Sequence, residues 1–228
     1  MARLSFREVV ARLESHYGRP EAPVVTGAWE LILWENIAYL ADDARRLEAF
    51  RALKRRVGLS PKKIVEAPDD ALLEATQRGI LAPLGAQKLR NCAEIVLREF
   101  NGDVRPVLKQ PLPAAKRALR KFPSIGEPAA EKILLFTESY PVLALESNGL
   151  RVLVRLGFGE EKKSYSTTYR LVQRAVADEL KTHCRWLIGV HQVLRQHGQE
   201  LCKRSAPLCS ECPLKAECAF YRAGGDRN

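Results

Sequence analysis

The sequence predicts an all-α protein, because its apolar residues follow the helical period, helix-capping signals recur and strand patterns are scarce. In several segments apolar residues recur every three or four positions, the spacing of one buried helix face. Ser5 with Glu8 forms a capping box, and Ser60-Pro61 offers a cap followed by a first-turn proline. Residues 141–145 make at most one short extended piece. We therefore expect many helices of modest length joined by short loops.

The expected helices can be followed in chain order. The apolar stripes run from Phe6 to Leu13, from Leu47 to Val57, from Leu89 to Val96, from Tyr169 to Leu180 and from Trp186 to Leu194. Asp42 and Asp43 can cap the second stripe, and Pro68 opens a short helix before the third. Asn101-Gly102 is expected to end the third stripe, and Gly198 to end the last.

Composition bounds the class of protein. The chain has 228 residues, of which 46% are hydrophobic and 28% charged, ordinary values for a folded domain. No apolar run has the length needed to cross a bilayer, and the first residues lack the apolar core of a secretory signal. We expect a cytoplasmic protein associated with the nucleoid.

The charge balance favours a polyanionic partner. Lys and Arg number 37 against 27 Asp and Glu, which gives a formal net charge of +10. Neutralising phosphates releases condensed counterions, so such a surplus supports nucleic-acid binding. The signal is generic, because basic proteins also bind membranes or merely stay soluble.

Six cysteines are present, and four of them crowd into the C-terminal segment. The four are Cys202, Cys209, Cys212 and Cys218, separated by six, two and five residues. Four thiolates can hold zinc or a 4Fe–4S cluster. Structural zinc more often shows two close pairs, whereas one close pair flanked by single cysteines favours the cluster. Cys92 lies on an apolar stripe, and we expect it in the core.

This cysteine spacing, with His197-Gly198 before it, resembles the C-terminal loop of the iron–sulfur members of the helix-hairpin-helix DNA glycosylase superfamily, similar to endonuclease III and adenine DNA glycosylase. The resemblance implies that the cluster is structural. It also implies that basic residues between the first two cysteines, here Lys203 and Arg204, face DNA phosphate. The alternative is that these two are ordinary solvated charges.

Residues 119–135, LRKFPSIGEPAAEKILL, resemble the helix-hairpin-helix of the same superfamily. A tight turn aims backbone N–H groups outward, and the next helix adds its positive end, which together bind phosphate. Gly126 supplies the permissive backbone, and Ile125 anchors the turn. The candidate DNA-binding residues here are Lys121, Pro123, Ser124, Ile125, Gly126 and Lys132.

Two departures from the hairpin motif matter for activity. Ser124 occupies the position of the motif's first glycine. Pro128 stands where the bifunctional members carry the lysine that attacks the sugar. Without an amine there, Schiff-base chemistry has no obvious nucleophile. We therefore expect a monofunctional enzyme without efficient AP-lyase activity.

Glu146 matches the position of the superfamily's catalytic aspartate, in the stretch 144–148. Breaking a base–sugar bond builds positive charge on the sugar, and a nearby carboxylate can stabilise it and activate water. The extra methylene moves the carboxylate by about 1 Å, which can cost roughly a hundredfold in rate. The alternative is that Glu146 only complements the dipole of a helix that begins beside it.

Residues 30–40 resemble the superfamily helix whose end enters the DNA stack. Glu35 falls where adenine DNA glycosylase carries the acid that protonates the departing base, and burial would favour that role. The alternative is a partly exposed helix glutamate. Tyr39 and Leu40 stand in the stack-entering region, and they are either apolar wedges beside a flipped nucleotide or core residues.

The resemblance implies two domains: residues 22–135 with the hairpin, and residues 1–21 plus 136–228 with the cluster. It implies a base-excision-repair glycosylase that hydrolyses the N-glycosidic bond of a flipped base. The partner is double-stranded DNA containing a damaged or mismatched base, bound by a monomer with no membrane involved. One alternative is an inactive iron–sulfur protein that binds DNA or lesions, and another is a redox carrier.

Overall fold

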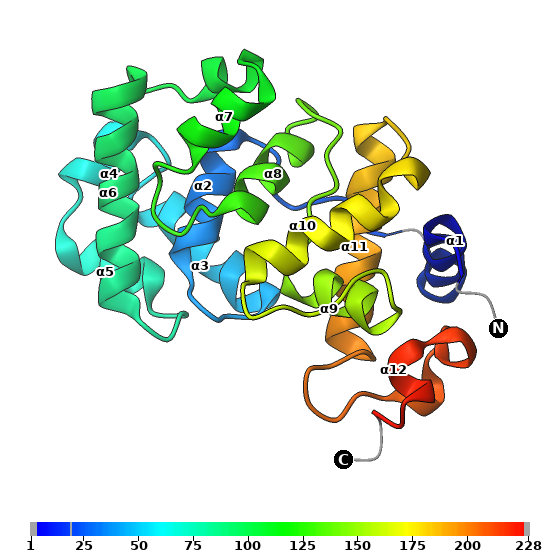
Figure 1. Ribbon diagram of the computed structural model, residues 1–228. Helices are drawn as coiled ribbons and strands as arrows, with labels where there is room; N and C mark the ends of the chain where they lie inside the picture. The colour runs from blue at the N-terminus through cyan, green and yellow to red at the C-terminus, as the bar shows by residue number, and fades with distance from the viewer. Residues whose placement is uncertain (1–3, 19, 226–228) are drawn as a thin grey trace. The chain divides into compact units, whose positions relative to one another are not determined.

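The computed structural model describes residues 4–18 and 20–225, and within them helices are the only regular secondary structure (Figure 1). The expected all-α class is confirmed. The segment 141–145 forms no strand. Across the described residues, no helix is both long and apolar enough to cross a membrane.

The chain folds as two compact units. Pro23–Tyr140 forms one, which we call the hairpin unit. The residues before Pro23 and those after Tyr140 form the other, which we call the cysteine unit.

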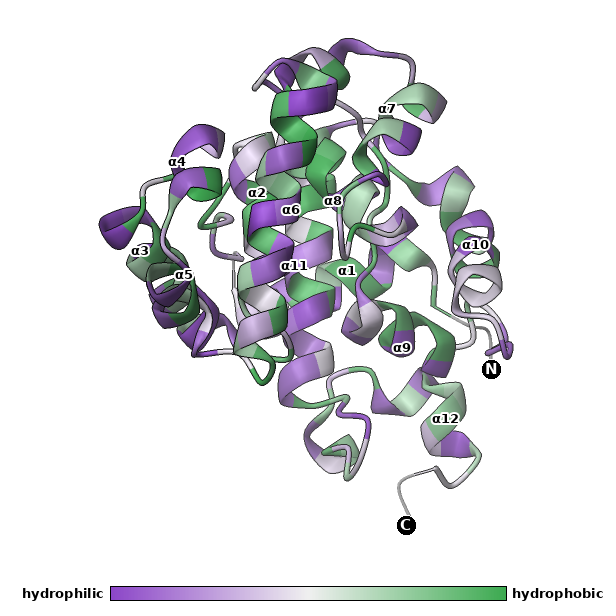
Figure 2. Ribbon diagram, turned by 90° about the vertical axis from the view of Figure 1, so that its left-hand side faces the viewer, coloured by the Kyte–Doolittle hydropathy of each residue, from purple (hydrophilic) through white to green (hydrophobic). Residues whose placement is uncertain are grey.

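The hairpin unit is built around its longest helix. Its elements are α2 (Ala28–Ile37), α3 (Asp43–Arg56), α4 (Pro61–Glu66), α5 (Asp69–Thr76), α6 (Ala82–Phe100), the 3-10 turn η1 (Arg105–Lys109), α7 (Leu112–Leu119) and α8 (Glu127–Phe136). Helix α6 packs against α2, α4 and α5. Its buried stripe includes Leu89, Cys92 and Val96, and hydrophobic and hydrophilic bands alternate along it in Figure 2. Burial of the Cys92 thiol raises its pKa to about 12, which confirms it as a core residue.

The cysteine unit is built on the pairing of α9 with α11. Its elements are α1 (Phe6–Tyr17), α9 (Ser147–Arg155), α10 (Tyr165–Val176), η2 (Ala177–Glu179), α11 (Cys184–Glu200), η3 (Cys209–Glu211), η4 (Lys215–Glu217) and α12 (Ala219–Arg222). Helix α11 packs against α9 and also against α1. All four cysteines of the C-terminal cluster lie between the end of α11 and the start of the short helix α12.

Three of the local capping signals are confirmed, whereas Ser60 takes the N-cap position of α4 before Pro61 but makes no side-chain capping hydrogen bond. Ser5 Oγ accepts from the amide of Glu8 at 3.2 Å, and the Glu8 carboxylate accepts from the Ser5 amide at 2.8 Å. Asp42 caps α3 by accepting from the Arg45 amide at 2.8 Å. Asn101, with φ +52°, ends α6 in the left-handed region.

Two helix ends differ from the expectation. Helix α10 ends at Val176, so Leu180 lies beyond it, after the turn η2. Helix α11 continues through Gly198 to Glu200. A Cβ added at Gly198 would lie 2.8 Å from the backbone oxygen of Asn148. The glycine is therefore explained by the close approach of α11 to α9, not by a helix end.

Candidate functional site

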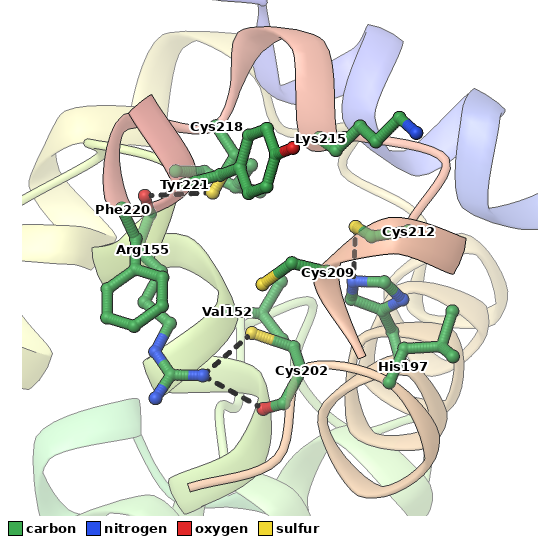
Figure 3. Close-up of a pocket in the computed structure, with 12 residues that line it drawn as sticks. Val152, Arg155, His197, Cys202, Cys209, Cys212, Lys215, Cys218, Phe220 and Tyr221 are labelled. Carbon is green, nitrogen blue, oxygen red and sulfur yellow. Dashed lines mark hydrogen bonds between the residues drawn. The ribbon is translucent and has the colours of Figure 1, made fainter. Parts of the chain in front are cut away.

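The four C-terminal cysteines come together around one cavity of the cysteine unit (Figure 3). Cys202 follows α11, and Cys209 is the first residue of η3. Cys212 directly follows η3, and Cys218 is the N-cap residue of α12. Val152 and Arg155 of α9 line the same cavity. The cavity thus gathers four thiols from a segment of only 17 residues.

Four thiols are a donor set that can hold zinc or a 4Fe–4S cluster. Within the described residues, no group of three or more His, Cys, Asp or Glu side chains is close enough to hold one metal ion. A structural zinc needs four sulfurs at about 2.3 Å from one point. A 4Fe–4S cluster instead takes four thiolates at the corners of a larger body. The four thiols that line one cavity are therefore the candidate ligands of such a group.

Groups around the sulfurs can stabilise negative charge. The Leu214 amide donates to Cys212 Sγ at 3.4 Å, and Arg155 Nη1 lies 3.4 Å from Cys202 Sγ. Burial raises the pKa of the Cys212 thiol to about 11, and neighbouring thiols add to the effect. Burial likewise raises the pKa of Cys218. Thiolates at Cys212 and Cys218 would therefore need positive charge beside them, which a bound metal would supply.

His197 connects this cavity to α1. Its Nε2 lies 3.6 Å from Cys212 Sγ, and its Nδ1 lies 3.0 Å from the hydroxyl of Tyr17 (Figure 3 shows the contact with sulfur). Burial lowers the pKa of His197 to about 4, so the ring is neutral and has one N–H donor. If that donor faces the sulfur, the other nitrogen accepts from Tyr17. A second tie to α1 is the ion pair of Arg12 with Glu217 at 2.9 Å.

Glu146 is the N-cap of α9. Its Oε1 accepts from the Gly149 amide at 2.8 Å, and its Oε2 accepts from Asn148 Nδ2 at 2.8 Å. Glu146 therefore stabilises the start of a helix, which is the structural alternative that the sequence analysis gave for it. The carboxylate is half-buried and held in a fixed orientation, with lone pairs on both oxygens left over.

Two arginines of α9 extend this network to the cluster loop. Arg151 donates to Asn148 Oδ1 at 2.8 Å, to the Gly198 carbonyl at 2.7 Å and to the Cys202 carbonyl at 2.9 Å. Burial lowers the pKa of Arg151. Arg155 donates to the Lys203 carbonyl at 2.7 Å. The sequence argument missed both arginines, although they lie one turn apart on a short helix with an apolar face.

Lys203 and Arg204, the candidate phosphate contacts, are exposed. Their backbone carbonyls are the groups that Arg155 holds, at 2.7 and 3.1 Å. Arg155 therefore fixes the backbone of the loop from which these two side chains extend.

A tyrosine pair lies beside the candidate carboxylate. Burial, together with the charge of Glu146, raises the pKa of Tyr165 to about 12. Its partly exposed ring stacks on Tyr169 with centroids 6.2 Å apart. The Tyr169 hydroxyl lies 3.4 Å from the Leu143 carbonyl. Tyr165 is a further neighbour of Glu146 that the sequence pattern did not single out.

In the hairpin unit, α7 and α8 flank the predicted turn. Ser124 has φ +60°, so a non-glycine residue occupies a left-handed position that favours glycine. Its hydroxyl accepts from Lys88 Nζ at 3.0 Å. Ile125 is buried and donates its amide to the Phe122 carbonyl. Gly126 is the exposed N-cap of α8, and its φ of −82° is open to any residue, so the expectation that it supplies a permissive backbone was wrong. Pro123 is half-buried within the same turn.

A half-buried lysine braces the two hairpin helices. Lys116 Nζ of α7 lies 2.7 Å from Glu127 and 2.5 Å from Glu131, both of α8. Burial alone would lower the pKa of Lys116, but these two hydrogen bonds outweigh it and the pKa is raised. Lys121, by contrast, is exposed and pairs with Glu99 at 2.8 Å.

Glu35 and Lys132, two candidates from different motifs, form an ion pair between α2 and α8. The Glu35 side chain is 18% exposed and the Lys132 side chain 15%. Lys132 therefore lies in a partly enclosed pair, unlike a surface lysine that contacts phosphate. The sequence offered no signal for this pairing.

Tyr39 and Leu40 follow α2 and are 51% and 69% exposed. This exposure excludes the alternative that they are core residues. The Tyr39 carbonyl accepts from the Ile80 amide at 3.2 Å, and Leu40 has φ +55°. Ile80 and its neighbour Leu81 are also exposed. Two adjacent loops thus present large apolar side chains.

Several known proteins are similar to this chain in sequence, and solved structures are similar to it in fold. No protein-family model matches the sequence. An endonuclease III from Rickettsia conorii is 25% identical over 162 residues, which cover 71% of this chain and 70% of the relative. A thymine/uracil-DNA glycosylase from Pyrobaculum aerophilum is 24% identical over 233 residues, covering 95% and 92%.

A solved structure of a trapped covalent intermediate of endonuclease III with DNA superposes with a TM-score of 0.78 at 20% identity. The superposition covers 96% of each chain. These relatives in sequence and this similarity in fold support the helix-hairpin-helix DNA glycosylase superfamily for the chain.

Proposed function

We propose that the protein is a base-excision-repair DNA glycosylase that hydrolyses the N-glycosidic bond of a damaged or mismatched base flipped out of duplex DNA. The observation that carries this proposal is the oriented carboxylate of Glu146, which caps α9 in a chain that also has the superfamily's hairpin. Two of the proteins that the chain resembles in sequence are named endonuclease III and thymine/uracil-DNA glycosylase, which supports the same reaction class.

Glu146 would act on the sugar. Cleavage of the base–sugar bond develops positive charge at the sugar, which a negative carboxylate stabilises. The same carboxylate would accept a proton from the attacking water. Because Gly149 and Asn148 already fix both oxygens, the carboxylate needs little reorganisation when the charge develops.

We propose a monofunctional enzyme, which leaves an abasic site and an uncut strand. Pro128 occupies the position of the superfamily's attacking lysine and has no amine. Schiff-base attack at that position is therefore unavailable.

Cys202, Cys209, Cys212 and Cys218 would hold a 4Fe–4S cluster. The supporting observation is that all four thiols line one cavity with hydrogen-bond donors beside two of them. When bound, the cluster would cross-link the C-terminal loop rather than take part in base removal. Lys203 and Arg204 of that loop would then contact phosphate.

The partner would be double-stranded DNA, bound by a monomer in the cytoplasm and near the nucleoid, with no membrane involved. The net charge of +10 supports a polyanion, and the hairpin turn from Pro123 to Gly126 would receive one phosphate. Lys121 would add positive charge beside it. Tyr39 and Leu40 would fill the space left by the flipped nucleotide.

A second candidate function is binding of DNA lesions without excision. The observation that favours it is that both oxygens of Glu146 already accept hydrogen bonds within α9, as a purely structural cap would. This alternative requires tight DNA binding and no release of base.

Glu146→Gln separates the two functions. The amide keeps an oxygen for the Gly149 amide but carries no charge. The proposed enzyme requires that this variant binds DNA like wild type and excises at least about a hundredfold more slowly. Glu161→Gln, on the exposed loop before α10, is the matched control and should excise normally. A Glu146→Gln variant as fast as a measurably active wild type contradicts the proposal.

A further inference from the structure

We propose that His197 is a positioning residue for the cysteine loop, which donates its Nε2–H to Cys212 Sγ when that sulfur binds iron, and that Tyr17 selects the tautomer this requires. The inference rests on the proposed 4Fe–4S cluster and deepens it. It names residues outside the four cysteines that help the chain to retain the cluster.

The contacts of the His197 ring are the first argument. His197 is 1% exposed and lines the cysteine cavity, and its Nε2 lies 3.6 Å from Cys212 Sγ (Figure 3). Its Nδ1 lies 3.0 Å from the hydroxyl of Tyr17. A neutral imidazole has one donor and one acceptor nitrogen. Both nitrogens therefore have a partner, and one partner is a candidate iron ligand.

The tautomer that iron binding requires is the second argument. A free Cys212 thiol could donate its S–H to Nε2. A thiolate bound to iron has no proton, so an unprotonated Nε2 would place its lone pair against an electron-rich sulfur. Iron binding therefore selects the ring that carries its proton on Nε2. Nδ1 is then the acceptor, and the Tyr17 hydroxyl is the donor that satisfies it.

A second buried histidine of the same helix provides a comparison. His191 of α11 is 4% exposed, and its Nδ1 lies 2.8 Å from the Ala144 carbonyl. It is not among the residues that line the cysteine cavity. His191 thus contacts backbone, as a structural histidine does, whereas His197 connects a hydroxyl of α1 to a sulfur.

The expected effect on a bound cluster follows from these contacts. The Leu214 amide also donates to Cys212 Sγ, so His197 would be a second N–H donor to this sulfur. Such donors orient a ligand sulfur and stabilise its negative charge, and they raise the reduction potential of a cluster. Loss of the ring should therefore speed the release of iron and make the reduction potential more negative. A side chain that only packs would leave the potential unchanged.

The experiment measures the release of iron to a chelator from the purified, cluster-loaded chain, with the reduction potential of the cluster as second readout. His197→Leu removes both ring nitrogens and should release iron roughly tenfold faster, with a more negative potential. His197→Gln retains a side-chain N–H and should recover part of the loss in both readouts. His183→Leu, at the exposed N-cap of α11, where the side chain makes no capping bond, is the control and should match wild type.

Tyr17→Phe tests the choice of tautomer. It removes only the hydroxyl, which frees Nδ1 to carry the proton. Iron release should then be faster than in wild type but slower than in His197→Leu. The double variant Tyr17→Phe/His197→Leu should release iron no faster than His197→Leu alone, because the hydroxyl acts through the ring.

Circular dichroism should show the same helix content in all variants. Four results each overturn the inference while the proposed cluster stands: a His197→Leu variant that releases iron like the control, an unchanged potential, an equal loss with glutamine and leucine, or a further loss from Tyr17→Phe in the leucine background. A wild type that holds zinc or no metal overturns the proposed cluster, and this inference with it. None of these readouts depends on excision, so the result is independent of the proposed glycosylase activity.

Discussion

Asn148 Nδ2 donates to Glu146 Oε2 across 2.8 Å, so the candidate carboxylate is held by a side chain of its own helix. Asn148 in turn accepts from Arg151, which also donates to the carbonyl of Cys202. A continuous set of hydrogen bonds therefore runs from the carboxylate to the cysteine loop. The carboxylate has a structural role and an orientation at once, and variants can separate the two.

Shortening Glu146 tests its geometry. Aspartate is a favoured N-cap, so Glu146→Asp should keep the free energy of unfolding within about 0.5 kcal/mol of wild type. Excision should fall roughly tenfold to a hundredfold because the carboxylate moves by about 1 Å. Glu146→Ala should also lose about 1 kcal/mol of stability with the cap. Urea unfolding and single-turnover kinetics measure the two effects. An aspartate variant that excises like wild type contradicts the importance of side-chain length.

Removing Arg151 should loosen the cysteine loop. Arg151→Gln loses the hydrogen bonds to the carbonyls of Gly198 and Cys202, at a cost of roughly 2 kcal/mol. A chelator should then remove iron from the variant faster than from wild type. The decay of visible absorbance measures this rate. Arg174→Gln, exposed on α10, is the control. Identical rates of iron loss in the two variants exclude this role.

The backbone at Ser124 predicts an unusual order of stability. Ser124→Gly and Ser124→Ala both remove the hydrogen bond from Lys88. Only glycine relieves the left-handed strain at φ +60°. The glycine variant should be more stable than the alanine variant by about 1 kcal/mol in urea unfolding. The opposite order would mean that the turn is not strained.

The exposed loop after α2 predicts a defect confined to base flipping. Because Tyr39 and Leu40 are exposed, alanine at both positions should change stability by less than about 0.5 kcal/mol each. Excision of a paired target base should slow about tenfold. It should recover when the target lies opposite an abasic site, where less stacking must be broken. Failure to recover would assign these side chains to another step.

The cysteine cavity predicts a specific iron content. Wild type should contain about four iron atoms per chain, and Cys212→Ser should lose most of them. Cys184→Ala, in a cysteine outside the cavity, should keep the wild-type content. Inductively coupled plasma spectrometry measures both iron and zinc. One zinc per chain and no iron would replace the cluster with a single-ion site.

Local sequence rules predicted much of the fold. The capping box at Ser5, the cap at Asp42 and the left-handed end at Asn101 depend on residues within one or two helical turns. Gly198 misled the prediction because its reason is tertiary, the approach of α11 to α9 at Asn148.

The site was predictable only where a motif carried it. Cysteine spacing indicated which thiols share a cavity, and the hairpin motif put Ser124 at a glycine position, where the structure has the left-handed φ. The Glu35–Lys132 pair joins residues 97 positions apart, and no local pattern encodes such a contact. Arg151 was missed for the same reason, since its main partners lie 47 and 51 positions away on the packed helix α11 and just beyond it.

The measurement that tests the central claim most directly is single-turnover incubation of wild type with a panel of duplexes. The panel holds uracil, thymine glycol, alkylated bases, hypoxanthine and mismatched adenine, each scored before and after hot alkali. We predict strand breaks at one or more target bases only after alkali, which marks hydrolysis without lyase activity. Breaks without alkali would contradict the monofunctional assignment. No product on any duplex, with tight DNA binding retained, would contradict the glycosylase itself.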